Sequence, residues 1–404
     1  MISSKELFYA HLAQTSPAPM ALEVEKAKGV YIYGTKGEKY IDLISGISVS
    51  NLGHAHPNVV AAVKQQADDY LHLMVYGEYI QGPQVQLATK ISSLLPPTLN
   101  NVYFVNSGSE ANEGAMKLAK RFTGRGELIH ANKSYHGSTQ GVLSIIGSDE
   151  FKQPFEPLLP GIKTIEFNEM DNLSAITTQT AAVIVEPIQG EAGVVIPTQE
   201  YLKALRAKCT AVGALLIFDE VQTGFGRTGS FWAWEQFGVQ PDILTIAKGM
   251  GGGMPIGAFI SSKEIMNTLT HHPVLGHITT FGGHPVCCAA SLATIDTIVK
   301  EDLISAVPEK EALLKRLLVH PAIVEVRGKG LLFAVEFENS AFNFEVINEC
   351  IKREVITDWF LFNDKSLRIA PPLIITLEEL EQACMKIIAA IDAVLTSKNS
   401  SIVQ

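Results

Sequence analysis

The sequence predicts an α/β protein: a large domain on a mostly parallel central sheet flanked by helices, followed by a smaller α+β domain. Three observations predict this fold. Between about residue 55 and residue 300, short apolar segments alternate with segments of helical periodicity, as in successive βα units. These apolar segments are continuous, as in strands buried on both faces. After residue 300 the order changes to a strand pair, a helix, a strand and a last helix, which is typical of an α+β domain.

The chain opens with an N-terminal segment, residues 1–53, in which two strands are expected at Gly29–Tyr33 and Lys39–Leu43. The large domain is expected over residues 54–300. Its predicted strands are short, apolar and bounded by turn residues: Asn101–Val105, Glu127–His130, Ala181–Val185, Leu215–Phe218 and Ile243–Ile246. A further strand at Ile256–Ile260 could run antiparallel to the others.

The smaller domain is expected over residues 301–404. Val324–Glu338 contains glycines between two apolar runs and is predicted to be a strand pair. A helix is expected near Phe344–Glu354 and a strand at Ser366–Ile369. The last helix is predicted to begin at Thr376, because Thr376 and Glu379 have the spacing of a capping box.

Composition narrows the class of protein. With 404 residues, 47% hydrophobic and 18% charged, the chain can bury a sizeable core. The net charge of -10, without a Lys/Arg cluster, argues against a nucleic-acid partner. No apolar run of about 18 residues predicts a membrane span, and no signal peptide is recognisable. Five cysteines without disulfide or metal-ligand spacing favour a reduced, cytoplasmic enzyme that holds no metal.

Two charged residues stand at the ends of predicted strands. Asp219 ends Leu215–Phe218, and Lys248 closely follows Ile243–Ile246. Ligands of open α/β sheets bind at the carboxyl ends of strands, so this acid and this amine are expected to meet. Together they indicate a cofactor with an aldehyde and a basic ring nitrogen. Pyridoxal phosphate fits, because lysine forms the Schiff base and a carboxylate keeps the ring nitrogen protonated.

A plainer interpretation of Lys248 is a solvated lysine at a glycine-rich turn. The run Gly249–Gly253 would instead let a bulky cofactor approach the backbone, and burial would lower the pKa of the lysine. The run is not a dinucleotide fingerprint, because Met254 stands where the third glycine is required. A nicotinamide-dependent oxidoreductase is therefore rejected.

A phosphate site is expected where Ser107, Gly108 and Ser109 follow a strand and open a helix, since free amides at a helix start bind anions. The alternative is an ordinary helix cap, because Ser107 and Glu110 also have capping-box spacing. Beside Asp219 and Lys248, the phosphate site is preferred.

Three loops supply further candidates. Tyr135 could stack on a cofactor ring, although a surface loop with incidental aromatic residues is the commoner case. Glu186 ends a predicted strand, where it could orient other groups, and Glu191 lies in a glycine-bounded loop suited to a movable gate. Gln222, three residues after Asp219, could hydrogen-bond a phenolic oxygen of the cofactor.

Five motifs along nearly the whole chain resemble one family, the class III, fold-type I pyridoxal-phosphate aminotransferases. The sequence is most similar to the acetylornithine/ornithine aminotransferase branch. The resemblance lies in Gly37–Asp42, Gly53–Pro57, Phe218–Gly229, Pro241–Gly249 and Arg368–Pro372. It implies the PLP-transferase type I fold.

The resemblance also implies roles for single residues. Lys248 would be the Schiff-base lysine and proton shuttle, and Asp219 would pair with the pyridine nitrogen. The phosphate would lie on Ser107, Gly108 and Ser109, the ring under Tyr135, and the phenolic oxygen beside Gln222.

The family pattern further implies a homodimer with shared active sites, in which Thr280 reaches the phosphate of the neighbouring subunit. Arg368 resembles the arginine that binds the substrate α-carboxylate, and Glu191 the acid that masks it. A ping-pong aminotransferase is expected, which moves an amino group from an amino acid or ω-amine to 2-oxoglutarate or pyruvate.

The chain departs from the ornithine branch at two positions. Ser138 stands where relatives carry an arginine that holds a second carboxylate, and Ile47 where ornithine aminotransferases carry a tyrosine. Serine cannot provide the bidentate, charged contact of arginine. A racemase or epimerase, or an amine-selective transaminase, on the same fold is therefore the alternative. A non-catalytic protein of the same fold is disfavoured by Lys248, Asp219 and the two serines.

Overall fold

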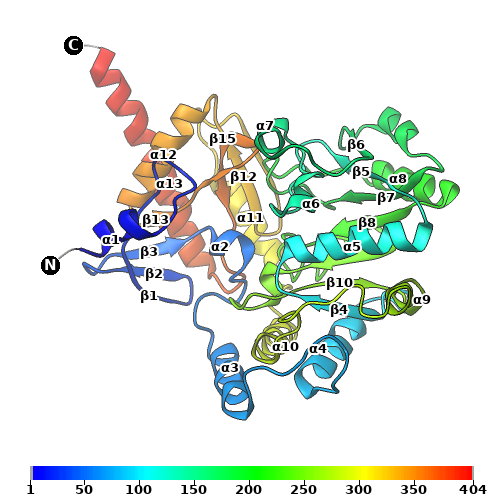
Figure 1. Ribbon diagram of the computed structural model, residues 1–404. Coiled ribbons are helices and arrows are strands. Elements are labelled where there is room, and N and C mark those ends of the chain that lie inside the picture. Colours follow the sequence, from blue (N-terminus) through cyan, green and yellow to red (C-terminus); the bar gives the residue numbers. More distant parts are fainter. Residues whose placement is uncertain (1–2, 403–404) are drawn as a thin grey trace.

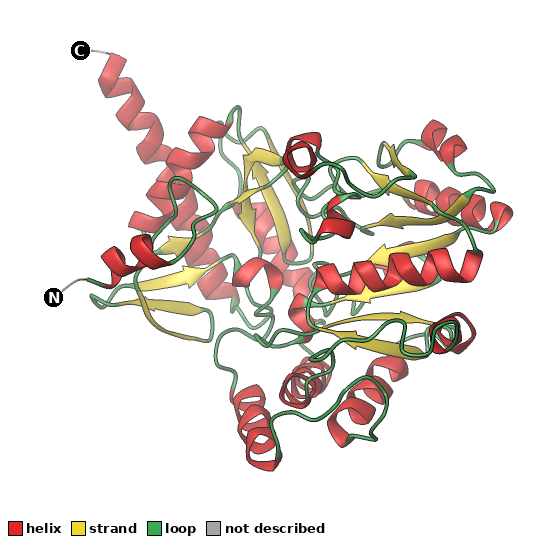
Figure 2. Cartoon of the chain, viewed as in Figure 1, coloured by secondary structure: helices red, strands yellow, loops and turns green. Residues whose placement is uncertain are grey.

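The computed structural model describes residues 3–402, in which helices cover both faces of a large central sheet and two smaller sheets lie beside it (Figures 1 and 2). The central sheet has seven strands in the order β4-β10-β9-β8-β7-β5-β6. Their bounds are β4 Asn101–Val105, β5 Glu127–Ala131, β6 Ile162–Ile165, β7 Thr180–Val185, β8 Leu215–Asp219, β9 Ile243–Ile246 and β10 Gly257–Ser261.

Five neighbouring strands, β6, β5, β7, β8 and β9, run parallel, and β10 runs antiparallel to both β9 and β4. The antiparallel direction considered for Ile256–Ile260 is thus confirmed. β8 shows why its sequence is continuously apolar. Leu215 and Ile217 belong to the core on one face of the sheet, whereas Leu216 and Phe218 belong to the core on the other face. A mostly parallel α/β sheet is therefore the observed fold.

Helices cover both faces of this sheet. The long helix α5, drawn in cyan across the sheet in Figure 1, packs on β9 and β10. α10 packs against α3 and α4, and α8 packs on β7 and β8. The helices up to residue 300 are α1 Ser4–His11, α2 Ser45–Ser48, α3 Pro57–Asp69, α4 Gly82–Ser93, α5 Gly108–Thr123, α6 Gln140–Leu143, α7 Asp149–Lys152, α8 Gln199–Val212, α9 Lys263–Met266 and α10 Pro285–Lys300.

Two four-stranded sheets complete the fold, in the orders β1-β2-β3-β13 and β11-β12-β15-β14. Their strands are β1 Val24–Lys28, β2 Tyr31–Gly34, β3 Lys39–Asp42, β11 Glu325–Lys329, β12 Leu332–Glu336, β13 Val355–Ile356, β14 Trp359–Phe360 and β15 Asn363–Ile369, and the helices beside them are α11 Val307–Leu317, α12 Ser340–Lys352 and α13 Leu377–Ile402. β13 pairs in parallel with β3, so the first 53 residues share a sheet with the C-terminal part. Val30, Ile41 and Leu43 pack in the same core as residues 307–394.

Most predicted elements are confirmed within two residues, with informative differences. α12 begins at Ser340 rather than Phe344, because the side chain of Asn339 caps it by accepting from the N–H of Phe342. The capping box at Thr376 is confirmed, since the hydroxyl and N–H of Thr376 donate to Glu379 and its hydroxyl accepts from the Glu379 N–H. Strands β1, β6, β13 and β14 were not predicted.

The domain boundaries after residues 53 and 300 stay a prediction, and residues 403 and 404 of the last domain lie outside the described residues. Among the residues that the structure describes, no helix combines the length and apolarity needed to cross a bilayer. Nor does this part of the chain gather three or more histidine, cysteine or acidic side chains as a metal site would.

Candidate active site

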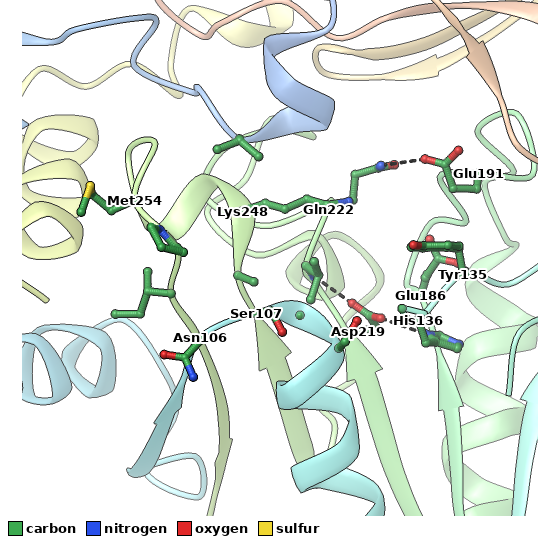
Figure 3. Close-up of a pocket in the computed structure, with 18 of the residues that line it drawn as sticks. Asn106, Ser107, Tyr135, His136, Glu186, Glu191, Asp219, Gln222, Lys248 and Met254 are labelled. Carbon is green, nitrogen blue, oxygen red and sulfur yellow. Dashed lines mark hydrogen bonds and ion pairs between the residues drawn. The ribbon is translucent and has the colours of Figure 1, made fainter. Parts of the chain in front are cut away.

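A cavity of about 380 Å³ opens where the parallel strands end and helix α5 begins (Figure 3). Its walls come from the turns that follow β4, β5, β7, β8 and β9, as expected for a ligand site at the carboxyl ends of strands. It brings together eight of the ten predicted site residues: Ser107, Gly108, Ser109, Tyr135, Glu191, Asp219, Gln222 and Lys248. The other two predicted residues, Arg368 and Thr280, lie outside its lining.

Lys248 stands at the head of a single 3₁₀ turn, Lys248–Met250, two residues after β9. Its φ of 47° is a left-handed conformation that is unusual for a residue other than glycine, and such strain often accompanies a functional side chain. Burial lowers the pKa of Lys248, while the carboxylates of Glu191 and Asp219 oppose this shift. A lowered pKa raises the fraction of neutral amine, which is the form that acts as a nucleophile or base.

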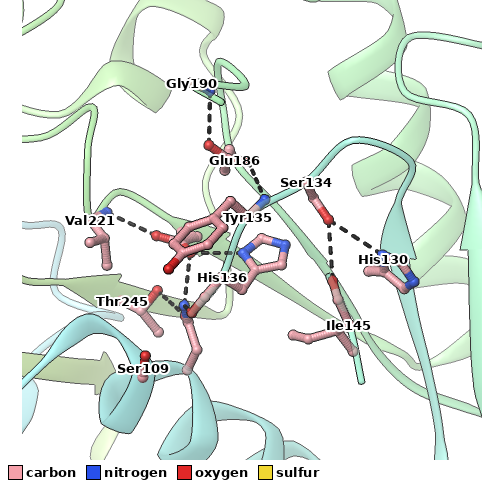
Figure 4. A network of polar contacts seen from close by, with 12 residues as sticks. Ser109, His130, Ser134, Tyr135, His136, Ile145, Glu186, Gly190, Val221 and Thr245 are labelled. Atoms are coloured by element: carbon pink, nitrogen blue, oxygen red, sulfur yellow. Dashed lines mark hydrogen bonds and ion pairs between the residues drawn. The ribbon is translucent and has the colours of Figure 1, made fainter. Parts of the chain in front are cut away.

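Asp219 ends β8 and is fixed by three hydrogen bonds (Figure 4). Its Oδ2 accepts from Asn112 Nδ2 and from His136 Nδ1, each at 2.8 Å, and its Oδ1 accepts from the Val221 N–H at 2.9 Å. Asn112 is itself held, because its Oδ1 accepts from the Thr245 hydroxyl at 2.7 Å. The carboxylate is therefore buried, oriented and acceptor-only, as a partner for a protonated ring nitrogen must be.

His136 and Asn112 are two site residues to which sequence analysis assigned no role. Both are fully or almost fully buried, at 2% and 0% exposure. Asn112 offered a signal that could have been used, because it is a polar residue on a helix face whose neighbours, Ala111 and Ala115, are apolar. His136 gave none, since its sequence distance from Asp219 is 83 residues.

At the start of α5, one of the two hydrogen bonds of the expected capping box is present, and the second one is made to a different residue. Ser107 Oγ accepts from the Glu110 N–H at 3.1 Å, so Ser107 is the helix cap. The Glu110 carboxylate accepts from the Asn106 N–H instead of the Ser107 N–H. The same helix end also lines the cavity. A helix cap and an anion site are thus compatible here, because Ser107, Gly108 and Ser109 line the cavity and the first amides of a helix have no partner within the helix.

Two glycines allow the walls to approach this helix start. A Cβ on Gly137, whose φ is +130°, would lie 2.1 Å from Ser109 Oγ. A Cβ on Gly108 would lie 2.9 Å from a methyl group of Val221. Larger residues at either position would push the turn after β5, or the turn after β8, away from the helix.

Tyr135 lies at the wall of the cavity, between Ser138 and Glu186. Its hydroxyl shares a 3.0 Å hydrogen bond with Ser138 Oγ, and its N–H donates to Glu186 Oε1 at 3.2 Å. Glu186 Oε2 accepts from the Gly190 N–H at 2.9 Å. Burial raises the pKa of Glu186 to about 7, and Asp219 adds to the shift while His136 opposes it. Glu186 therefore holds the turn that carries Tyr135.

Glu191 and Arg368 form a buried bidentate pair at the edge of the cavity. Arg368 Nη1 and Nη2 donate to Oε1 and Oε2 of Glu191 at 2.8 and 2.9 Å. Gln222 Nε2 also donates to Glu191, at 3.1 Å, and its own Oε1 has no partner. Burial alone raises the pKa of Glu191, but Arg368 and then Lys248 lower it to about 2. Glu191 is thus ionised and lies between Arg368 and the cavity.

A second carboxylate on Arg368 was not predicted. Asp358 Oδ1 accepts from Arg368 Nε at 2.9 Å. Burial raises the pKa of Asp358 to about 6; Arg368 opposes this shift, and Glu191 adds to it. Asp358 follows β13, and its local sequence does not indicate an ion pair. The pairing of β14 with β15, the strand that carries Arg368, brings the two residues together.

Thr280 is separate from the cavity. It is exposed, in the segment between α9 and α10, and the neighbouring Thr279 accepts from Asn106 Nδ2 at 3.2 Å. Within one chain, therefore, Thr280 is not one of the residues that line the cavity, although the adjacent Thr279 contacts Asn106, which does.

The cavity residues match a ligand with three distinct parts. The start of α5 offers amides and hydroxyls to a phosphate, Asp219 offers a carboxylate to a basic ring atom, and Lys248 offers an amine to an aldehyde. The partnerless amide oxygen of Gln222 leaves a polar group without a hydrogen bond in a buried wall of this cavity. The residues present thus fit a phosphorylated pyridine aldehyde.

Comparisons with known proteins agree with this chemistry. Residues 12–391 match the family model described as aminotransferase class-III. A putrescine aminotransferase of Pectobacterium atrosepticum is 40% identical over 91% of this chain and 81% of its own length. An acetylornithine aminotransferase of Methanopyrus kandleri is 40% identical over 95% of this chain and 97% of its own length. The structure of the Toxoplasma gondii ornithine aminotransferase superposes with a TM-score of 0.91 at 30% identity, covering 98% and 96% of the two chains.

Proposed function

The chain belongs to the class-III aminotransferases and is a pyridoxal-phosphate-dependent enzyme of that family; we propose that it transfers an amino group to a 2-oxo acid from a donor with a non-acidic remote end, meaning that the end far from the transferred amino group bears no carboxylate. The observation that supports this most directly is the placement of Lys248, Asp219 and the start of α5 around one cavity.

The cofactor would be held by groups from four turns. The phosphate would lie on Ser107, Gly108 and Ser109, and the ring nitrogen beside Asp219. Tyr135 would stack on the ring, and Gln222 would contact the phenolic oxygen. When bound, pyridoxal phosphate supplies an aldehyde that takes up the donor amine and a protonated ring that draws electrons from the donor Cα.

Lys248 has two roles in this proposal. Its Nζ would hold the cofactor covalently through the aldehyde. As a free amine it would move a proton away from the donor Cα, for which its lowered pKa is suited. Three hydrogen bonds fix the orientation of the Asp219 carboxylate, which would lie beside the ring nitrogen.

Arg368 and Glu191 would let one cavity accept both an amine and an acid. With Glu191 in place, the guanidinium is neutralised, and a donor without an α-carboxylate meets no unpaired cation. When Glu191 moves aside, the two Nη atoms can bind the α-carboxylate of a 2-oxo acid. The loop that carries Glu191 is bounded by Gly190 and Gly193, which suits such a movement.

Replacing Arg368 by alanine tests this assignment. We expect the KM for 2-oxoglutarate and pyruvate to rise by about tenfold or more, because a buried bidentate contact with a carboxylate is lost. The rate of the half-reaction with an amine donor that lacks a carboxylate should stay within about threefold. Steady-state kinetics with each acceptor, compared with single-turnover rates for the donor, measure the two effects. An unchanged KM for both acids would contradict the role of Arg368.

The remote end of the donor is inferred from what lines the cavity. Among the described residues of the lining, Lys248 is the one Lys or Arg side chain, whereas Glu186, Glu191 and Asp219 are acidic. Ser138, bonded to Tyr135, occupies the position at which ornithine-branch relatives are expected to carry arginine. A second carboxylate on the donor would therefore find no charged partner. Donors that end in an amine, an amide or an apolar group are favoured over dicarboxylates, and by the same argument pyruvate is favoured over 2-oxoglutarate as the acceptor.

A racemase or epimerase on the same fold is not supported further. The relatives described above are aminotransferases. Chiral analysis of a single amino acid incubated without an acceptor would reveal inversion if it occurs.

We also propose a homodimer with shared active sites. Thr280 is exposed beside Ile278 and Phe281, which are 51% and 54% exposed. The ring of Phe281 lies 4.9 Å from His72, and the adjacent Leu71 is 61% exposed, so these apolar residues form one surface patch. Such patches support subunit contact. A Thr280→Ala variant should bind the cofactor more weakly, and sedimentation equilibrium should show a dimer; a monomer would contradict the proposal.

A cytoplasmic location is proposed on the cysteines. Cys209, Cys287, Cys288, Cys350 and Cys384 are all buried and free in the described structure, as is usual for a protein kept in a reducing compartment. Fractionation of the source cells would test this location.

The experiment that tests the proposed function uses the visible absorbance of the enzyme loaded with pyridoxal phosphate. Putrescine, 4-aminobutyrate, L-ornithine, N-acetylornithine, L-alanine and L-glutamate are added separately. We expect the absorbance of the enzyme-bound aldehyde to disappear with a donor whose remote end is not acidic, and to return when a 2-oxo acid is added. Absorbance that no donor removes would contradict transamination, and removal by L-glutamate alone would contradict the donor class.

A further inference from the structure

Arg368 contacts two carboxylates, and the function proposed above uses only one of them. Glu191 occupies the Nη edge of the guanidinium with two hydrogen bonds. Asp358 occupies the opposite position, at Nε, with one hydrogen bond of 2.9 Å. The pair with Glu191 is buried and the pair with Asp358 is partly buried, because the side chains of Arg368, Glu191 and Asp358 are 2%, 5% and 18% exposed. A second, largely shielded carboxylate at one guanidinium requires a physical explanation.

The segment that carries Asp358 fixes the guanidinium by contacts of different kinds. The backbone N–H of Arg368 donates to the carbonyl of Asp358 at 2.9 Å, in addition to the Nε bond. Nη2 donates to the carbonyl of Trp359 at 3.0 Å. The guanidinium carbon lies 4.4 Å from the centre of the Phe360 ring, which covers one face of the group. Three consecutive residues thus determine the plane and rotation of the guanidinium, and Glu191 occupies the edge shared by the two Nη atoms.

The two carboxylates differ in their relation to the cavity. Asp358 lies between two short strands, β13 and β14, each of which pairs with a neighbouring strand, and it does not line the cavity. Glu191 lies in the glycine-bounded loop after β7 and lines the cavity, where its Oε2 also accepts from the Leu361 N–H at 3.1 Å and its carbonyl accepts from the Phe362 N–H at 3.0 Å. If Glu191 leaves, Arg368 keeps one counterion, so no buried cation is left unpaired. This matters because an uncompensated buried charge is strongly destabilising.

The ionisation state of Asp358 fits this role at neutral pH. Burial raises its pKa to about 6, with Arg368 opposing and Glu191 adding to the shift, and Asp42 is a further acid that adds to it. Asp358 is therefore mostly ionised above pH 7 while Glu191 is in place. Departure of Glu191 removes one raising influence and leaves Arg368, so Asp358 becomes more fully ionised.

We propose that Asp358 is a positioning residue that determines how this pocket recognises carboxylates. It keeps the Nη edge of Arg368 turned toward the cavity, so that the α-carboxylate of a 2-oxo acid replaces Glu191 without any rotation of the arginine. This inference rests on the proposed function and deepens it. The negative charge of Asp358 repels Glu191 and the substrate carboxylate that replaces it to a similar degree, so this charge has little effect on which of the two binds Arg368. The hydrogen bond from Nε to Asp358, in contrast, orients the guanidinium for the substrate carboxylate.

The distinction between orientation and charge gives two variants with different expected results. Asp358→Asn keeps an oxygen for Nε and removes the charge, whereas Asp358→Ala removes both. Binding of 2-oxoglutarate, and separately of pyruvate, is measured by calorimetry on the enzyme loaded with pyridoxal phosphate, which has no amino group to transfer. We expect the dissociation constants to rise by about tenfold in Asp358→Ala, because a misaligned fork loses one of two bonds. They should stay within about threefold in Asp358→Asn.

Two controls separate positioning from general damage. The half-reaction with putrescine, which has no carboxylate, should stay within about threefold of wild type in both variants. Asp242→Ala provides a matched control, because Asp242 pairs with Arg206 and accepts from the Leu216 N–H outside the cavity lining. It should leave the binding of both acids unchanged. If Asp358→Ala does not fold, Asp358→Ser, whose shorter side chain cannot reach Nε, replaces it.

Each outcome decides the inference. Unchanged acid binding in Asp358→Ala would overturn it, and so would equal losses for the acids and for putrescine. Equal losses in Asp358→Asn and Asp358→Ala would show that charge, not orientation, is the contribution of Asp358, and would also overturn it. Because acid binding is measured without turnover, an enzyme that transaminates no donor would refute the proposed function and still report on Asp358.

Discussion

Replacement of Lys248 by alanine is expected to reduce transamination by at least about 10³-fold. The variant loses the amine that would hold the cofactor and the base that would move the proton from the donor Cα, and a positioned base alone contributes about 10²- to 10⁴-fold. The three carboxyl groups of the cavity lining are already engaged. Asp219 accepts from three hydrogen-bond donors, Glu191 pairs with Arg368, and Glu186 accepts from the N–H groups of Tyr135 and Gly190. The loss should be seen as a slower single-turnover half-reaction, measured by stopped-flow absorbance with the donor in excess.

Chemical reduction gives an independent measurement. Borohydride treatment of the wild-type enzyme, followed by peptide mass spectrometry, should find the cofactor on the peptide that contains Lys248, and in the variant on none. Lys310→Met is a matched control, because Lys310 is also buried but donates to the carbonyl of Leu373 outside the cavity lining. It should lose stability and keep the half-reaction. Activity of Lys248→Ala within tenfold of wild type would refute the assignment.

Replacement of Asp219 by asparagine is expected to slow proton removal by about 10²- to 10³-fold, while cofactor affinity falls only several-fold. A neutral amide cannot keep the ring nitrogen protonated, so the ring withdraws electrons less effectively. The hydrogen-bond donors around Asp219 make the substitution more disruptive than its small change in side-chain size would indicate. Asp219 accepts from Asn112, His136 and Val221, and an amide NH₂ would face donors in place of an acceptor.

The measurement for Asp219→Asn is the primary deuterium isotope effect at the donor Cα, together with equilibrium cofactor binding. A larger isotope effect with modestly weakened binding would place the defect in proton removal. Asp242→Asn makes the same substitution in a pair with Arg206 that does not line the cavity, and it should change neither quantity. If Asp219→Asn lost only cofactor binding, with an unchanged isotope effect, the proposed role of the carboxylate would be wrong.

Much of the central sheet could be predicted because of how its strands are buried. β7, β8, β9 and β10 are buried along their whole length, so their sequences are continuously apolar and stand out from the helices between them. β6 was missed because it lies at the edge of the sheet and two of its four residues are exposed. β13 and β14 were missed because each has two residues, and strands of that length are defined by their partners alone.

The residues of the candidate site also fall into two groups, those that the local sequence could indicate and those that it could not. Lys248 and Asp219 could be inferred because parallel strands end at one edge of a sheet, so residues at those ends converge wherever the strands pair. His136 and Asn112 could not be assigned, because their contact with Asp219 spans 83 and 107 residues. The apolar neighbours of Asn112 indicate a buried polar residue but do not identify Asp219 as its partner, and the local sequence of His136 gives no such indication.

The sequence by itself determined the fold class, the family resemblance, and the lysine, aspartate and serines of the cavity. These properties follow from local periodicity and from residues placed at the ends of secondary structure. Only the tertiary structure decided that Asp358 is the second counterion of Arg368, and that Thr280 does not line the cavity of its own chain. The physical reason is that ion pairing and burial depend on distances in space. Packing sets those distances both for residues that are near in sequence, as Asp358 and Arg368 are at a separation of ten residues, and for residues that are far apart, as Glu191 and Arg368 are at 177.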